Sequence, residues 1–238
     1  MTGTVAIDWF PRSVGQDWDG YAVVVVDVIR ATTTAVTAVS LGRRCFPAAT
    51  VEEAFAHAAN LEHPLLVGEL GGNVPFGFDL TNSPSAIARR TDVTRPMVLL
   101  SSSGTALMQE TRGSDAVYLA CFRNYCALPA HLADRHGRIA LIGAGSRGEF
   151  REEDQMCCAW IAEGLAQAGY IFEDGRTEEL VRRWSGAAPE ACLVSKSIAY
   201  LRRTGQVEDL EFILRHVNDL SAVFMLERDE VVLVRMAE

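Results

Sequence analysis

The stretch YAVVVVDVIRATTTAVTAVSL, residues 21–41, places an apolar run directly before a carboxylate, a guanidinium and three consecutive threonines. The run 22–26 is typical of a buried strand, and the threonines at 32–34 then begin a helix. A strand that ends in Asp27 and Arg30 at a helix N-terminus can hold an anion and a divalent cation together. The stretch therefore indicates phosphate chemistry, although the same residues also suit an ordinary turn and helix cap.

Apolar runs rich in valine and isoleucine recur along the chain, separated by segments with helical spacing. They occupy residues 22–29, 65–68, 97–100, 116–119 and 138–142. Such alternation predicts βα units on a mostly parallel sheet covered on both faces. No proline-, glycine- or serine-rich linker divides the chain, so we predict a single unit over residues 1–238, whose length also suits two related α/β halves.

Two helix starts have clear signals. Thr50 and Glu53 form a capping box, which predicts a helix over 51–61, and Ser83 followed by Pro84 begins another. Beyond residue 177 the strand pattern gives way to three or four short helices. The last two apolar runs, 222–226 and 231–234, flank a turn and predict a terminal hairpin.

Composition excludes several classes of protein. The chain has 238 residues, is 49% apolar and carries a net charge of −9, which argues against a nucleic-acid partner. The N-terminal sequence lacks a basic leader and an apolar signal core, and the longest apolar run is short, so we expect no membrane partner and a cytoplasmic location. The six cysteines lack zinc-site spacing and are expected to be reduced thiols.

Three further strand ends carry small, hydroxylated or acidic residues, and the carboxyl ends of parallel strands are where ligands bind in open α/β sheets. The first is the glycine-rich segment 68–84, in which Glu69 and Asp79 are candidate metal ligands. The second is the SSSGT sequence at 101–105, whose hydroxyls and N–H groups suit phosphate oxygens. The third is GAGSRG at 143–148. These sites are expected to converge.

The GAGSRG sequence also spells G-x-G-x-x-G between a strand and a helix, so a dinucleotide-binding oxidoreductase is an alternative. Glu173 or Asp174 would then be the ribose ligand. Against this interpretation, four acidic residues follow at the start of the next helix, where they would repel a pyrophosphate unless a divalent cation intervened.

Several catalytic motifs are absent from the sequence. There is no G-x-x-x-x-G-K-[ST] phosphate loop and no G-x-S-x-G nucleophile elbow. The five histidines lie in helical or turn segments away from the four strand ends, which argues against a histidine base.

The motifs DVIRATTT, GFDLTNSP, SSSGTAL and GAGSRGEFREEDQ, in this order, resemble the 2-phosphosulfolactate phosphatase family over nearly the whole chain. The resemblance implies a magnesium-dependent acid phosphatase of three-layer α/β/α fold that hydrolyses phosphate esters of 2-hydroxy acids. The positions that match family motifs are Asp27, Arg30, Thr32, Thr33, Thr34, Glu69, Asp79, Asn82, Thr105, Gly145 and Asp154.

From this resemblance and the chemistry of the residues we predict a Mg²⁺-dependent phosphomonoester hydrolase acting on a small anionic phosphoester. Asp27 and Arg30 are the predicted catalytic residues, and Asp27, Glu69 and Asp154 the predicted metal ligands. Asp27 attacks directly or a metal-bound water does. The predicted substrate-binding residues are Thr32, Thr33, Thr34, Asn82, Ser102, Ser103, Gly104, Thr105, Gly145 and Ser146. A homodimer is among the partners considered, and a non-hydrolytic anion-binding member of the family is a further alternative.

The chain departs from the family pattern at two positions. Leu70 and Ala106 stand where the family usually carries arginine. A guanidinium pairs with an anionic substrate group. The absence of these two arginines therefore predicts a substrate with fewer negative charges than phosphosulfolactate, or an altered reaction.

Overall fold

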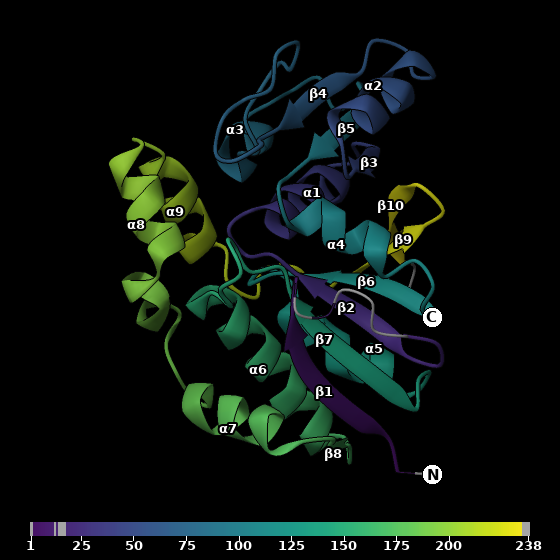
Figure 1. Cartoon of the computed structure of the whole chain (residues 1–238), viewed down its shortest axis with the longest axis vertical. Helices are drawn as coiled ribbons and strands as arrows, with labels where there is room; N and C mark the ends of the chain where they lie inside the picture. Colours follow the sequence, from purple (N-terminus) through teal and green to yellow (C-terminus); the bar gives the residue numbers. More distant parts are fainter. Residues whose placement is uncertain (1, 12, 14–17, 235–238) are drawn as a thin grey trace.

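The computed structural model describes the chain except residues 1, 12, 14–17 and 235–238. Its strands are β1 (Thr4–Trp9), β2 (Ala22–Val26), β3 (Cys45–Ala48), β4 (Leu65–Gly68), β5 (Met97–Leu100), β6 (Ala116–Ala120), β7 (Arg138–Gly143), β8 (Ile171–Phe172), β9 (Val223–Glu227) and β10 (Glu230–Val234). They form one ten-stranded sheet in the order β4-β5-β3-β10-β9-β6-β2-β7-β1-β8. The predicted mostly parallel α/β architecture is confirmed, with helices on both faces of the sheet (Figure 1).

The helices are α1 (Ala31–Ser40), α2 (Val51–Ala59), α3 (Pro84–Ala88), α4 (Gly104–Glu110), α5 (Leu128–Ala133), α6 (Glu152–Gln167), α7 (Gly175–Trp184), α8 (Lys196–Arg203) and α9 (Val207–Arg215), with 3₁₀ turns η1 (Tyr125–Ala127) and η2 (Pro189–Val194). Both predicted caps are present: Thr50 accepts from the Glu53 N–H at 3.1 Å and Ser83 from the Ala86 N–H at 3.2 Å. None of the helices in the described ranges is long and apolar enough to cross a membrane.

The sheet consists of two parallel groups joined by a hairpin. Strands β4, β5 and β3 run parallel to one another, as do β6, β2, β7, β1 and β8. The hairpin of β9 and β10 pairs antiparallel with β6 on one side and with β3 on the other. We call the two groups the three-stranded half and the five-stranded half.

The core lies on both faces of the sheet because successive residues of a strand point to opposite sides. In β2, Val24 and Val26 belong to the cluster that packs under α5 to α9. Val23 and Val25 belong to the second cluster, which packs under α1, α3 and α4. A strand that is apolar on both faces is therefore fully buried, and its end is a rigid place for a functional group.

Strands of both halves run toward the middle of the molecule, and the column of α7, α8 and α9 passes alongside (Figure 1). The loops that follow β2, β4, β5 and β7 meet there, since residues of all four line a single pocket. The predicted convergence of the four strand ends is confirmed.

Candidate active site

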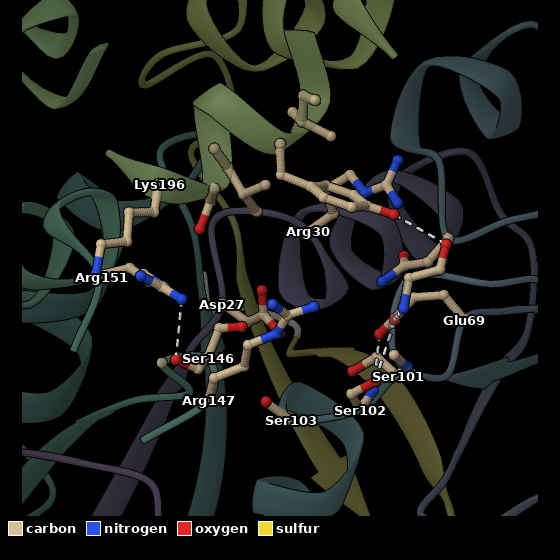
Figure 2. Close-up of a pocket in the computed structure, with 18 of the residues that line it drawn as sticks. Asp27, Arg30, Glu69, Ser101, Ser102, Ser103, Ser146, Arg147, Arg151 and Lys196 are labelled. Atoms are coloured by element: carbon tan, nitrogen blue, oxygen red, sulfur yellow. Dashed lines mark hydrogen bonds between the residues drawn. The ribbon is translucent and has the colours of Figure 1, made fainter. Parts of the chain in front are cut away.

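The pocket at the strand ends has a volume of about 600 Å³. Figure 2 shows side chains from the loops after β2, β4, β5 and β7 on its walls, with α8 closing the remaining side. Among the predicted site residues, those that line it are Asp27, Arg30, Glu69, Asn82, Ser102, Ser103, Gly145 and Ser146. The cavity is large enough for a small phosphate ester together with several waters or a cation.

Asp27 follows β2 directly and reaches the pocket while only 7% exposed. Burial raises the pKa of its carboxyl to about 7, the Ala31 backbone N–H opposes that rise, and the nearby carboxylate of Glu69 adds to it. A side chain at Gly104 would overlap the Asp27 carboxylate, so the glycine at the start of α4 leaves this group accessible. Asp27 is therefore a largely buried carboxyl group at the end of a rigid strand, and it borders the pocket.

The three threonines of α1 have a different role from the predicted one. Thr32, Thr33 and Thr34 are at most 1% exposed and do not line the pocket. The Thr32 hydroxyl donates to the Asp27 carbonyl at 2.7 Å and accepts from the Asp27 N–H at 2.9 Å. Thr33 and Thr34 donate to the Val28 and Arg30 carbonyls at 2.8 and 3.1 Å. These hydroxyls fix the turn after β2 rather than facing a phosphate.

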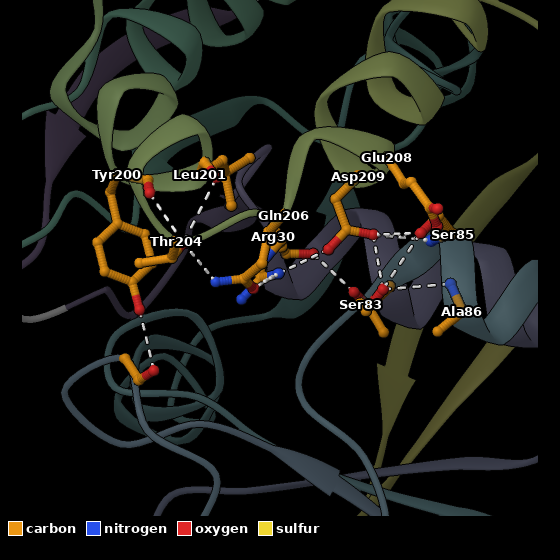
Figure 3. A network of polar contacts seen from close by, with 12 residues as sticks. Arg30, Ser83, Ser85, Ala86, Tyr200, Leu201, Thr204, Gln206, Glu208 and Asp209 are labelled. Atoms are coloured by element: carbon orange, nitrogen blue, oxygen red, sulfur yellow. Dashed lines mark hydrogen bonds and ion pairs between the residues drawn. The ribbon is translucent and has the colours of Figure 1, made fainter.

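Arg30 lies on the pocket wall but already has an acidic partner. Its Nη1 donates to Asp209 at 2.6 Å and to the Gln206 side chain at 2.5 Å, both at the start of α9 (Figure 3). The other oxygen of Asp209 accepts from the hydroxyls of Ser83 and Ser85, each at 2.6 Å. This network joins α1, α3 and α9 and leaves the remaining Arg30 donors without partners among the described residues.

Glu69 ties together the two loops of the three-stranded half. One of its oxygens accepts from the Ser102 N–H at 2.8 Å, and the other accepts from the Gly72 N–H at 2.8 Å and the Ser102 hydroxyl at 3.1 Å. The Ser102 hydroxyl in turn accepts from the Gly71 N–H. Glu69 borders the pocket, but most of its acceptor capacity is used within the protein.

Asp154 performs the same task in the five-stranded half. Its two oxygens accept from the Val28 N–H at 2.9 Å and the Gly145 N–H at 3.2 Å, so it links the loops after β2 and β7. It is buried behind the pocket and does not line it, and burial raises its pKa well above the ordinary range. The neighbouring Glu153 is also buried, and its Oε2 has no partner among the described residues.

Asn82 is the clearest sign that the pocket holds a ligand. Its side chain is 2% exposed, lines the pocket, and has an Oδ1 atom without a hydrogen-bond partner in the described structure. A buried polar atom left unpaired is costly unless a ligand, ion or water satisfies it. Asp79 lies elsewhere, accepting from the Leu66 N–H at 2.9 Å, and is not a wall residue.

The serines after β5 differ in burial: Ser101 is buried, Ser103 is partly buried and Ser102 is exposed. Ser101 and Thr105 bond each other: the Ser101 N–H donates to the Thr105 hydroxyl at 2.8 Å, and the Thr105 N–H donates to the Ser101 hydroxyl at 3.2 Å. Thr105 is fully buried and is not a wall residue, unlike the prediction that it binds phosphate. Ser101, Ser102 and Ser103 all line the pocket (Figure 2).

The wall contributed by α8 was not predicted. Lys196 bonds both Glu149 oxygens, at 2.6 and 2.8 Å, and the Tyr200 hydroxyl donates to the Gly72 carbonyl at 2.9 Å. Arg203 also lines the pocket. Helix α8 follows no strand, so the strand-end rule does not mark it as functional. The one hint in the sequence is that Lys196 is the sole lysine.

Positive charge predominates around the pocket, although the chain is acidic as a whole. Its wall carries five basic residues and three carboxylates: Arg30, Arg147, Arg151, Lys196 and Arg203 against Asp27, Glu69 and Glu149. Neither Leu70 nor Ala106 is a wall residue. Arg30 is paired with Asp209, and Arg151 and Lys196 with Glu149, which leaves Arg147 and Arg203 to offset the charge of a substrate. The less charged substrate expected from the missing arginines stays a prediction.

The fit of a divalent cation is partial. The pocket offers only oxygen ligands, in the Asp27 carboxylate and the unpaired Asn82 Oδ1, which is the donor type that Mg²⁺ prefers. Over the residues that the structure describes, no group of three or more His, Cys, Asp or Glu side chains is placed to hold a metal. The predicted set of Asp27, Glu69 and Asp154 is thus not assembled as one cluster.

Local packing explains the first two glycines of GAGSRG without a dinucleotide. A side chain at Gly143 would overlap the Phe150 ring, and one at Gly145 would lie 2.6 Å from the Glu149 carbonyl oxygen. The loop turns back at Ser146–Glu149 before α6 begins at Glu152. Nothing observed favours the dinucleotide alternative.

Comparison with known proteins adds a family to this geometry. The family model for 2-phosphosulpholactate phosphatase matches residues 11–229. A protein of Deinococcus radiodurans named probable 2-phosphosulfolactate phosphatase is 34% identical over 211 residues, covering 87% of this chain and 86% of the relative. Proteins of the same name from Symbiobacterium thermophilum and Clostridium perfringens are 32% and 28% identical, covering 83% and 89% of this chain and 88% of each relative.

Proposed function

The chain belongs to the 2-phosphosulfolactate phosphatase family, and we propose that it hydrolyses the phosphate monoester of a small 2-hydroxy acid such as 2-phosphosulfolactate. It is a phosphoric monoester hydrolase. The observation that carries the proposal is a buried carboxylate, Asp27, at the end of a rigid strand in a pocket with five basic wall residues. Such a pocket binds a polyanion and brings its phosphoryl group to an oxygen nucleophile.

Asp27 is the residue best placed for the chemistry. Attack by its carboxylate on phosphorus would break the ester P–O bond, release the hydroxy acid once its oxygen gains a proton, and leave an acyl phosphate for water to hydrolyse. Alternatively, Asp27 orients the water that attacks phosphorus directly. Arg30, held by Asp209 and Gln206, keeps donors for the nonbridging oxygens, and Ser102 and Ser103 line the same pocket.

We further propose that Mg²⁺ serves this reaction. Asp27 would hold it with Asn82, and Glu69 borders the same pocket; Mg²⁺ commonly binds one or two carboxylates, with water and substrate oxygens completing its shell. When bound, the cation neutralises phosphoryl charge and orients the phosphate. Asp154 supports this site from behind by fixing both neighbouring loops.

Phosphate release from 2-phosphosulfolactate, with Mg²⁺ and with EDTA, tests the proposal. We expect release that requires Mg²⁺ and is lost in Asp27→Asn. Mg²⁺ is also expected to raise the melting temperature of the wild type, and much less that of Asp27→Asn, because it binds the folded site. Acid quenching followed by mass spectrometry of the Asp27 peptide would detect an acyl phosphate and so separate the two modes of attack.

The cytoplasmic location and the homodimer stay predictions. Light scattering coupled to gel filtration would establish the oligomeric state, and fractionation of the source cells would establish the location.

A further inference from the structure

The turn Ser146–Glu149 holds an arginine in an unfavourable backbone position. The Ser146 N–H donates to the Glu149 carbonyl at 2.9 Å, and the Glu149 N–H donates to the Ser146 carbonyl at 3.0 Å. The two central residues, Arg147 and Gly148, have φ angles of 51° and 77°. Tight turns with two positive φ angles favour Asn-Gly, Asp-Gly or Gly-Gly. Arg147 therefore occupies a backbone conformation that residues other than glycine, asparagine and aspartate rarely adopt.

The Arg147 side chain is the wall cation with the least protein contact. Figure 2 shows it pointing into the pocket from the loop after β7. Its guanidinium makes no hydrogen bond or salt bridge with any residue in the described ranges. Lys196 and Arg151, by contrast, both bond Glu149, and Arg203 lies over the Tyr200 ring at 5.6 Å. Arg147 is therefore the arginine most available to a ligand.

Depth in the pocket separates two anion-binding positions. Asp27 and Arg30 are buried, at 7% and 6% exposure, whereas Arg147 is exposed at the rim. A phosphoryl group must reach Asp27 to react, so the rest of the substrate extends toward the rim. The groups that extend there from a phosphorylated sulfo-hydroxy acid are a carboxylate and a sulfonate, and a guanidinium binds either through charge-assisted hydrogen bonds.

We propose that Arg147 binds an anionic group on the carbon skeleton of the substrate, its carboxylate or sulfonate, and thereby determines specificity for phosphorylated acids over simple phosphate esters. This assignment rests on the proposed phosphatase function and adds a residue to it.

The decisive variant is Arg147→Asn, because Asn-Gly is a favoured pair for this turn and the charge is removed without harm to the backbone. Arg228 offers a matched control. It also has a positive φ, of 55°, in the turn between β9 and β10, and it does not line the pocket. Both variants are expected to melt no lower than the wild type, so a kinetic difference between them reports on the pocket.

Three substrates separate the possible roles of Arg147: 2-phosphosulfolactate, 2-phospholactate and isopropyl phosphate, which carries no second anion. We expect Arg147→Asn to lower kcat/KM about 10- to 100-fold for the acids and to leave it within about twofold for isopropyl phosphate. Arg147→Lys is expected to recover part of the loss, and Arg228→Asn to match the wild type. A loss with both acids identifies the carboxylate, and a loss with 2-phosphosulfolactate alone identifies the sulfonate.

An equal loss with all three substrates, or no loss with any, overturns the assignment of Arg147. A wild type that releases phosphate from none of them contradicts the proposed function instead. Calorimetric binding of sulfolactate, which has both skeleton anions but no phosphoryl group, tests Arg147 without turnover. We expect about 10- to 100-fold weaker binding by Arg147→Asn than by the wild type and Arg228→Asn; equal binding by all three proteins refutes the inference.

Discussion

In the five-stranded half, Asp154 accepts main-chain N–H bonds from Val28 and Gly145 and so fastens the loops after β2 and β7. In the three-stranded half, Glu69 accepts from the N–H groups of Gly72 and Ser102 and fastens the loops after β4 and β5. The geometry is the same, but Asp154 is 3% exposed behind the site whereas Glu69 stands partly exposed at the pocket.

This difference distinguishes a carboxylate that only fixes the loops from one that can also contact a ligand. Glu69 and Asp154 both use their oxygens mainly to accept from backbone N–H groups, whereas Asp27 lines the pocket without linking two loops in this way. Water can replace a lost partner at Glu69 but hardly at Asp154. Mutations at the three acidic residues should therefore have three different signatures.

The largest effect is expected at Asp27. Asp27→Asn should lower kcat/KM at least about a thousandfold, because it removes the nucleophile or ligand while keeping the shape. Its melting temperature should stay the same or rise in EDTA, since a buried charge is removed. Asp79→Asn, outside the pocket, is the control for phosphate release. Activity within about threefold of wild type would show that Asp27 takes no part in the reaction.

Asp154→Ala should give the largest loss of folding stability. It leaves the buried N–H groups of Val28 and Gly145 without their acceptor, which costs about 2–5 kcal/mol in total. Urea unfolding of wild type and variant measures the difference. A loss below about 0.5 kcal/mol would mean that this link between the loops contributes little.

The pH dependence of stability should show the burial of Asp27. Its folded pKa of about 7 lies above the unfolded value, so its contribution to stability is complete below the unfolded pKa and is lost as pH rises through about 7. In EDTA, the wild type should therefore lose roughly 1–2 kcal/mol more than Asp27→Asn between pH 5.5 and pH 8. Parallel pH profiles for the two proteins would contradict this expectation.

The smallest effect is expected from Glu69→Ala. Because water reaches the freed N–H groups of Gly72 and Ser102, the loss of unfolding free energy should be about 1 kcal/mol or less. The same urea experiment, run beside Asp154→Ala, provides the comparison. Equal losses would show that exposure does not distinguish the two links.

Local signals in the sequence were enough to predict much of the fold. The valine-rich run of β2 and the caps at Thr50 and Ser83 act within a few residues, and the strand-end rule then brought four loops to one place. Strands β1, β3 and β8 were not predicted, and β8 has only two residues. In β1, Asp8 lies within a short alternating run. Strand β3 has only four residues, and its Pro47 argues against a strand.

Side-chain roles were harder to predict, because they depend on distant partners. Three threonines at a helix start look like phosphate ligands, yet in the structure their hydroxyls bond main-chain groups of the preceding turn. Arg30 was predicted to be catalytic, and nothing in the sequence indicated that its Nη1 donates to Asp209, 179 residues away. No local pattern reveals such a pair.

The hairpin of β9 and β10 stands in the middle of the sheet, although it follows in sequence every strand that it joins. Each half can form its parallel pairs from earlier segments, but the two become one sheet only when this late hairpin enters between β3 and β6. Pairings of such long sequence separation form slowly, since a large loop must close first. The order of the chain thus predicts that the sheet is completed late in folding, and that the pocket, which needs both halves, forms only then.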